Sequence, residues 1–178
     1  RNALFSDSPN FFSENTSIVL TDFPSPKNNS LYQKLVTVNV GDRVVNDAGQ
    51  IVELTYGTQV KPAGCSSSDC TAQFDGEPIE MAQLVANFAF NNQHHWEDGT
   101  PVSATDSIFA FQWALENSPG RSTDETHSYM LNENGIVEWI GIPGLFTQQI
   151  LDYFWAPLPQ HHWGGKSMSE ISLDDLLS

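Results

Sequence analysis

Apolar and polar residues alternate along the first half of the chain, and this pattern predicts β-strands. Val36, Val38 and Val40 are separated by polar residues, which is the two-residue period of a strand that buries one face. Segments 43–45 and 50–54 then flank four turn-forming residues, so we expect them to form a β-hairpin. One further short strand is expected at residues 17–20.

A longer apolar segment, residues 83–90, is expected to be a central strand. Leu84, Ala86, Phe88 and Phe90 share one face at the two-residue period, and the opposite face is also largely apolar. A strand with two apolar faces is typical of a position inside a sheet. The turn sequence Asp-Gly-Glu-Pro at 75–78 comes shortly before it.

The second half of the chain predicts another hairpin. Residues 127–131 and 136–142 flank the turn sequence Asn-Glu-Asn-Gly. The preceding residues, 121–126, are polar and are expected to form a loop.

Helical spacing of apolar residues replaces the alternation in two places. An apolar run begins after Ser103 and predicts a helix that is buried on more than one side and ends near 117–120. Residues 145–154 predict a second substantial helix, and Ser172 has the features of a helix start. Antiparallel hairpins and a sheet packed with two or more helices make the predicted fold class α+β.

The start of the first helix carries the most informative motif of the chain. Asp98 and Gly99 form a turn dipeptide, because glycine adopts positive φ without steric cost. Pro101 keeps the residue before it extended. Ser103 is then expected to be the N-cap, with Asp106 placing a carboxylate at the positive end of the helix dipole. The turn explains the Asp98 carboxylate and the cap explains that of Asp106. The alternative is that one of them has a catalytic role.

Charge and hydropathy exclude several classes of function. The net charge is −15, with 7 Lys and Arg against 22 Asp and Glu, and a field of this sign repels nucleic acids and anionic membranes. We read the acidity as a source of solubility rather than of cation binding. The sequence contains no apolar run of the roughly 18 residues needed to span a membrane.

The two cysteines, Cys65 and Cys70, lie in a loop rich in serine. Their spacing suits a small disulfide, and such a bond favours an extracytoplasmic location. Free thiols are a second possibility, and a metal site a third, although no further ligands lie nearby in the sequence.

Other groups that could carry chemistry lack a recognisable catalytic pattern. The histidines form two adjacent pairs, at 94–95 and 161–162, whose neighbouring side chains diverge. Acidic residues that neighbour aromatics could form a glycosidase pair, but surface acids beside buried aromatics are the simpler interpretation; they are Glu97, Asp98, Glu138 and Asp152. No nucleophile elbow, P-loop or dinucleotide fingerprint occurs. We therefore expect no enzyme activity, cofactor or metal.

Several segments, in order along the chain, together resemble the family 5 solute-binding proteins, the oligopeptide and dipeptide receptors of ABC importers. The segment from Trp96 to Asp106 is similar to the W-x-D-G-x-P-x-[ST]-A-x-D motif of that family. The other matching segments are residues 38–54, the Gly-Cys and Asp-Cys pairs at 64–65 and 69–70, and residues 81–85, 118–124 and 157–164.

The resemblance implies that residues 1–178 are one domain within a longer, two-lobed receptor. They would be the smaller subdomain of the N-terminal lobe, with the fold of type II periplasmic binding proteins. Family members are anchored outside the cytoplasm by lipid, and their partners are a peptide ligand and an ABC permease. Most peptide-binding residues of the family lie in other segments, so no ligand-binding residue is assigned here. The alternatives are a secreted glycan-active or metal-assisted hydrolase domain, and a self-associating interaction domain.

Overall fold

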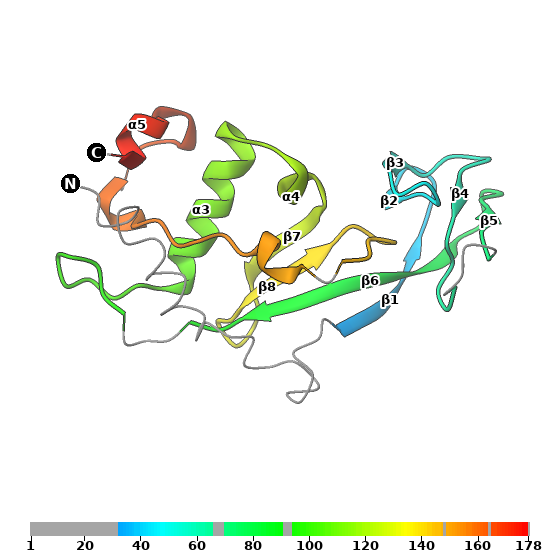
Figure 1. The fold of residues 1–178 in the computed structure, drawn as a ribbon, viewed down its shortest axis with the longest axis horizontal. Coiled ribbons are helices and arrows are strands. Elements are labelled where there is room, and N and C mark those ends of the chain that lie inside the picture. The colour runs from blue at the N-terminus through cyan, green and yellow to red at the C-terminus, as the bar shows by residue number, and fades with distance from the viewer. Residues whose placement is uncertain (1–31, 66–69, 91–93, 148, 164, 178) are drawn as a thin grey trace.

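The computed structural model describes residues 32–65, 70–90, 94–147, 149–163 and 165–177, and it has a mixed α+β fold with antiparallel sheets (Figure 1). The strand expected at 17–20 lies outside these residues. The main sheet contains, in spatial order, β1 (Tyr32–Val38), β6 (Ile79–Phe88), β8 (Val137–Gly141) and β7 (Thr126–Leu131). Two small sheets pair β2 (Arg43–Val45) with β3 (Ile51–Glu53), and β4 (Gln59–Val60) with β5 (Ala72–Gln73).

The helices described by the structure lie in the second half of the chain, some before β7 and the others after β8. The α-helices are α3 (Ala104–Asn117), α4 (Arg121–Asp124) and α5 (Leu173–Leu177). Three short 3₁₀-helices complete the described elements: η2 (Ile150–Tyr153), η3 (Gln160–Trp163) and η4 (Met168–Glu170).

Strand β6 organises the main core, as the sequence predicts for a central strand. It pairs with β1 on one side and with β8 on the other. Leu84, Ala86 and Phe88 are buried on the same face, and Phe90 packs against their cluster. The register sets Ala86 opposite Trp139, which has no exposed surface. The expectation that these four residues share a face is therefore confirmed.

Helix α3 buries two sides, which confirms the expectation drawn from its apolar circumference. Its residues Ala104, Ile108 and Phe111 pack against the core of the main sheet. Phe109 and Ala110 belong instead to a second cluster formed with the C-terminal segments. The helix thus lies between the sheet and the chain from 158 to 176, and this position explains why apolar residues occur on more than one of its sides.

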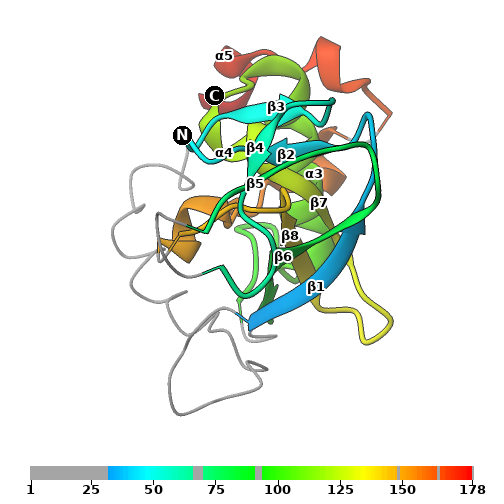
Figure 2. The ribbon, with the colours of Figure 1, turned by 90° about the vertical axis from the view of Figure 1, so that its right-hand side faces the viewer.

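The small sheets form a separate end of the molecule. Figure 1 shows β2 to β5 at one end of the long strand β6 and α3 at the other. This end has its own buried cluster, which consists of Val38, Val44, Leu54, Val60, Phe74 and Met81. Figure 2 looks onto this end and shows β1 and β6 leading away from it. Strand β6 therefore connects two apolar cores.

Most of the predicted hairpins and helix ends are confirmed. The β2–β3 hairpin and the β7–β8 hairpin form where the turn sequences place them. Helix α3 ends at Asn117, and α5 begins directly after Ser172. Strand β6 begins four residues earlier than predicted, at Ile79, because its pairing with β1 extends to that residue.

The second substantial helix predicted at 145–154 was wrong. Of the residues described within this range, only the four of η2 are helical, in 3₁₀ form. Gly144 has φ +85°, so the chain turns where the predicted helix would begin. The Thr147 hydroxyl then accepts a hydrogen bond from the Gln149 backbone N–H, at 3.1 Å, and such local bonds compete with helical ones.

Two smaller predictions also need correction. Residues 121–126 were expected to be a loop, but the structure shows α4 and then the first residue of β7. Thr123 stabilises the start of α4, because its hydroxyl accepts the Gly120 backbone N–H at 2.8 Å. The pairing of β4 with β5 was not predicted, since strands of two residues are too short to show a period.

Gly144 offers a direct test of packing between the two cores. A β-carbon at this position would lie 2.8 Å from the Val45 carbonyl oxygen and 2.7 Å from the Met81 Cε. We expect Gly144→Ala to lower the free energy of unfolding by about 1–3 kcal/mol through overpacking, beyond the cost of positive φ. Gly49→Ala is the matched control, because Gly49 has φ +79° and open space around its Cα. Urea unfolding of both variants measures the difference, and equal losses would contradict the close packing described here.

Candidate functional site

The turn predicted from Asp98 and Gly99 is the tip of a small hairpin. The Trp96 backbone N–H donates to the Thr100 carbonyl at 2.7 Å, and the Gly99 N–H donates to the Trp96 carbonyl at 2.9 Å. Gly99 has φ +85°, a conformation that favours glycine. Pro101 pairs with His95 in an isolated antiparallel bridge. The hairpin delivers the chain directly to the start of α3.

Ser103 is the N-cap of α3 and has extended backbone angles. One oxygen of the Asp106 carboxylate accepts the Ser103 backbone N–H at 2.9 Å and the Ser103 hydroxyl at 3.1 Å. Asp106 thus satisfies a backbone donor at the helix start and also places negative charge at the positive end of the helix dipole.

Asp106 also joins segments that are far apart in the sequence. The same carboxylate oxygen accepts the indole N–H of Trp96 at 3.3 Å. Its other oxygen accepts the Gln160 backbone N–H at 3.1 Å, and its backbone carbonyl accepts the Leu158 N–H at 3.2 Å. The residue is only 4% exposed. Because both carboxylate oxygens are occupied by donors of the fold, the geometry makes Asp106 a structural anchor.

Asp98 makes the second connection to the C-terminal segment. Its Oδ2 lies 2.8 Å from the His161 Nε2, and its Oδ1 accepts the Thr100 backbone N–H at 2.8 Å. The His161 ring also lies near the indole of Trp96, with centroids 6.4 Å apart. Hydrogen bonds from Thr100, followed by that of His161, lower the pKa of the Asp98 carboxyl from 3.8 to about 2.

We call this group the junction site, defined as Trp96, Asp98, Ser103, Asp106, Gln160 and His161. The structure therefore brings together the sequence-predicted residues Asp98, Gly99, Pro101, Ser103 and Asp106 on one hairpin and helix start. Sequence reasoning missed the contribution of Gln160 and His161. The one signal for them was that they lie in a segment, 157–164, that shares the family resemblance.

The disulfide between Cys65 and Cys70 lies elsewhere. The two sulfur atoms are bonded, with Cα atoms 5.6 Å apart, so the disulfide is the correct choice among the three possibilities for these residues. The bond closes the connection between β4 and β5, at the end of the molecule opposite α3 (Figure 1). It is separate from the junction site and constrains the small-sheet end.

The other chemically interesting residues do not gather at the junction site. Trp139 and Trp163 are buried, and His162 packs edge-on against Trp163. Glu138 lies on β8 and Asp152 on η2. Among the described residues, no group of three or more histidine, cysteine or acidic side chains is placed to hold a metal ion.

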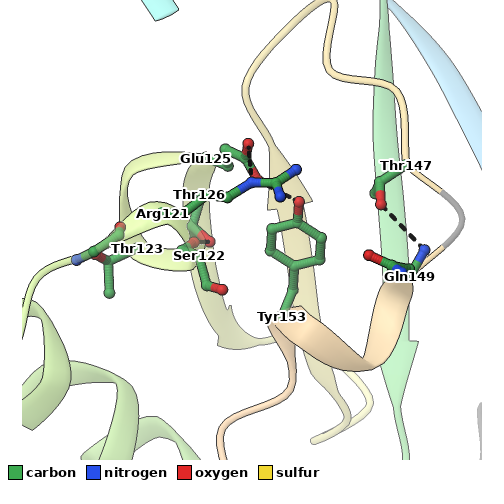
Figure 3. Close-up of polar contacts among 9 residues, drawn as sticks. Arg121, Ser122, Thr123, Glu125, Thr126, Thr147, Gln149 and Tyr153 are labelled. Atoms are coloured by element: carbon green, nitrogen blue, oxygen red, sulfur yellow. Dashed lines mark hydrogen bonds and ion pairs between the residues drawn. The ribbon is translucent and has the colours of Figure 1, made fainter.

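A second polar cluster, which the sequence did not reveal, joins α4 to η2. Figure 3 shows Arg121, Glu125 and Tyr153 gathered at one point. Glu125 accepts a hydrogen bond from the Arg121 Nε at 2.9 Å and another from the Tyr153 hydroxyl. Burial, and then the neighbouring carboxylate, raise the pKa of Tyr153, which is 2% exposed. The phenol therefore stays protonated and donates to Glu125, which fixes η2 against α4.

Among the described residues, no helix is both long enough and apolar enough to cross a membrane.

We expect Asp106→Ala to lower the free energy of unfolding by about 2–4 kcal/mol, because it leaves several buried donors without an acceptor. Asp175→Ala is the matched control. Asp175 occupies the same position after Ser172 and accepts its backbone N–H at 2.8 Å, but its side chain is 37% exposed. Its loss should lower the free energy of unfolding much less than that of Asp106, because water can replace the lost hydrogen bonds. Thermal and urea unfolding of both variants provide the test, and similar losses would contradict the anchoring role of Asp106.

The Asp98 carboxyl should titrate at about pH 2 in the folded protein, as measured by carbon NMR. Since this pKa lies below its ordinary value of 3.8, the carboxylate contributes stability above about pH 4, and this contribution is lost as the pH falls towards 2. In His161→Ala the pKa should rise but stay below 3.8, because Thr100 provides the larger effect.

His127→Ala is the control for this titration, since His127 lies on β7 and is exposed. It should leave the Asp98 titration unchanged. A pKa near 4 in the unmodified chain would contradict the hydrogen bonding described for the hairpin.

In comparisons with known proteins, neither a protein-family model nor a curated protein matches this sequence. The functional interpretation therefore depends on the sequence motifs and on the geometry of the junction site.

Proposed function

We propose that this chain is part of the substrate-binding component of an ABC importer, of the peptide-binding type. The observation that carries the proposal is the segment from Trp96 to Asp106, which reads W-E-D-G-T-P-V-S-A-T-D. It is similar throughout to the W-x-D-G-x-P-x-[ST]-A-x-D motif of the family 5 solute-binding proteins.

The junction site supports this proposal because it joins two of the resembling segments. Gln160 and His161, from the segment 157–164, bind Asp106 and Asp98 across sequence separations of 54 and 63 residues. Asp98 and Asp106, two conspicuous residues of the motif, make these contacts, and the indole of Trp96, a third, lies near the His161 ring. The motif is thus a unit that a family could share for its fold rather than for ligand contact.

The disulfide and the fold class are compatible with the same proposal. A disulfide between Cys65 and Cys70 suits an oxidising, extracytoplasmic compartment. The α+β architecture with antiparallel sheets is compatible with a subdomain of a type II periplasmic binding protein. In this proposal the intact receptor is anchored by lipid, binds peptide between two lobes and delivers it to a permease, without enzymatic activity.

This segment would then contribute little to the peptide pocket. Both oxygens of Asp106 are occupied within the fold, and Asp98 is paired with His161. The role of the segment in the receptor is to form a stable part of one lobe. Closure of the two lobes around the ligand would gate its transfer.

The proposal is tested by peptide capture. The product of the complete reading frame is incubated with a tryptic digest of casein, desalted and measured by native mass spectrometry. We expect the intact product to retain short peptides, whereas residues 1–178 alone should retain none. Maltotriose, an oligosaccharide, is the control ligand and should not be retained.

Three outcomes would contradict the proposal. The intact product could retain no peptide, residues 1–178 alone could bind peptide stoichiometrically, or the digest could be shortened during incubation. The last result would indicate a hydrolase.

A further inference from the structure

Strand β1 is an open edge of the main sheet. It pairs with β6 along all seven residues, from Tyr32 opposite Val85 to Val38 opposite Ile79. Among the residues that the structure describes, no strand pairs with its other side. Every second residue of β1 therefore directs its backbone N–H and C=O groups away from the sheet.

The two edges of the sheet differ in how they are protected. At the opposite edge, β7 has a register irregularity between Thr126 and Ser128, and α3 and α4 contact it. Strand β1 has a regular register and contains no proline. Bulges, prolines, charges and covering helices are the devices that keep edge strands from pairing with other chains. Within the described part of the chain, Lys34 supplies the one such device found at β1, its charge.

The composition of β1 also differs from that of the chain as a whole. Its sequence, Tyr-Gln-Lys-Leu-Val-Thr-Val, contains no acidic residue, although the chain has a net charge of −15. Leu35, at the centre of the strand, is 61% exposed. Its exposed residues are Gln33, Lys34, Leu35 and Thr37, so the edge carries one positive charge and no negative one. On a strongly acidic molecule, an edge without acidic residues is where a second copy approaches with the least repulsion.

We propose that β1 pairs with β1 of a second copy of this chain, antiparallel, so that the two main sheets become one continuous sheet. Two-fold symmetry about Leu35 lets all seven residues pair, and this sets Leu35 opposite its own copy. Lys34 then lies opposite Val36 of the second copy, and Gln33 lies opposite Thr37. This inference does not depend on the proposed transport function.

The register centred on Leu35 is favoured by length over those centred on Lys34 and on Val36, since either shift shortens the overlap of Tyr32–Val38. Charge disfavours the Lys34-centred register further. Moving the two-fold axis by one residue, to Lys34, would place two lysines directly opposite each other and would shorten the overlap. Like charges opposite each other destabilise a strand pair, whereas apolar pairs stabilise it. A single strand pair buries a small interface, so we expect a weak dimer with a dissociation constant on the order of 100 µM.

Sedimentation velocity of the 178-residue chain over a range of concentrations tests the proposal. We expect a reversible monomer–dimer equilibrium that Leu35→Lys weakens at least tenfold, because it places like charges at the two-fold axis. Leu151→Lys is the matched control, since Leu151 is also 61% exposed but lies on η2. It changes the net charge by the same amount and should leave the equilibrium nearly unchanged.

Hydrogen exchange locates the interface independently. Backbone amides of residues 32–38 should become more protected as the protein concentration rises, and this change should be absent in Leu35→Lys. The proposal is overturned if the chain stays monomeric up to millimolar concentration, or if it dimerises equally well in both variants. Concentration-dependent protection confined to other strands would also overturn it.

Discussion

The burial of the Asp106 carboxylate is the constraint on which the arrangement of the helical end depends. A charged group that is 4% exposed is tolerated only when its oxygens accept hydrogen bonds. Here the donors come from the hairpin, from the helix start and from the C-terminal segment, through Trp96, Ser103 and Gln160. Each of these three parts is therefore fixed relative to α3 by the need to satisfy one carboxylate.

Anchored in this way, α3 packs against two apolar clusters, one on each side. One side of the helix packs on the main sheet, and the other holds the C-terminal segments, whose cluster includes Leu158, Trp163 and Ile171. The Ser107 hydroxyl adds to this joint, since it lies 2.6 Å from the Tyr129 hydroxyl and within hydrogen-bonding distance of the Trp155 carbonyl. Strand β6 performs the corresponding role at the other end, where it reaches the cluster of the small sheets. In the described part of the chain, one helix and one strand thus connect three apolar clusters.

Asp98 and Asp106 both accept hydrogen bonds from other parts of the fold, which gives the two motif acids a structural role. The open edge of β1, by contrast, is a feature of the surface, and a contact made there would leave the junction site undisturbed.

The sequence by itself determined the local elements. The Asp98-Gly99 turn, the Ser103 cap, the apolar faces of β6 and both hairpins follow from interactions between residues close in the chain, so their patterns are legible without the fold. Residues 145–154 have the apolar spacing of a helix but do not form the long helix that was predicted. Gly144 turns the chain there, and the Thr147 hydroxyl competes for a backbone donor. Only the tertiary structure decided that Gln160 and His161 meet Asp106 and Asp98, and that Tyr153 meets Glu125. Those contacts depend on where distant segments pack, and a pattern of neighbouring residues carries no information about that distance.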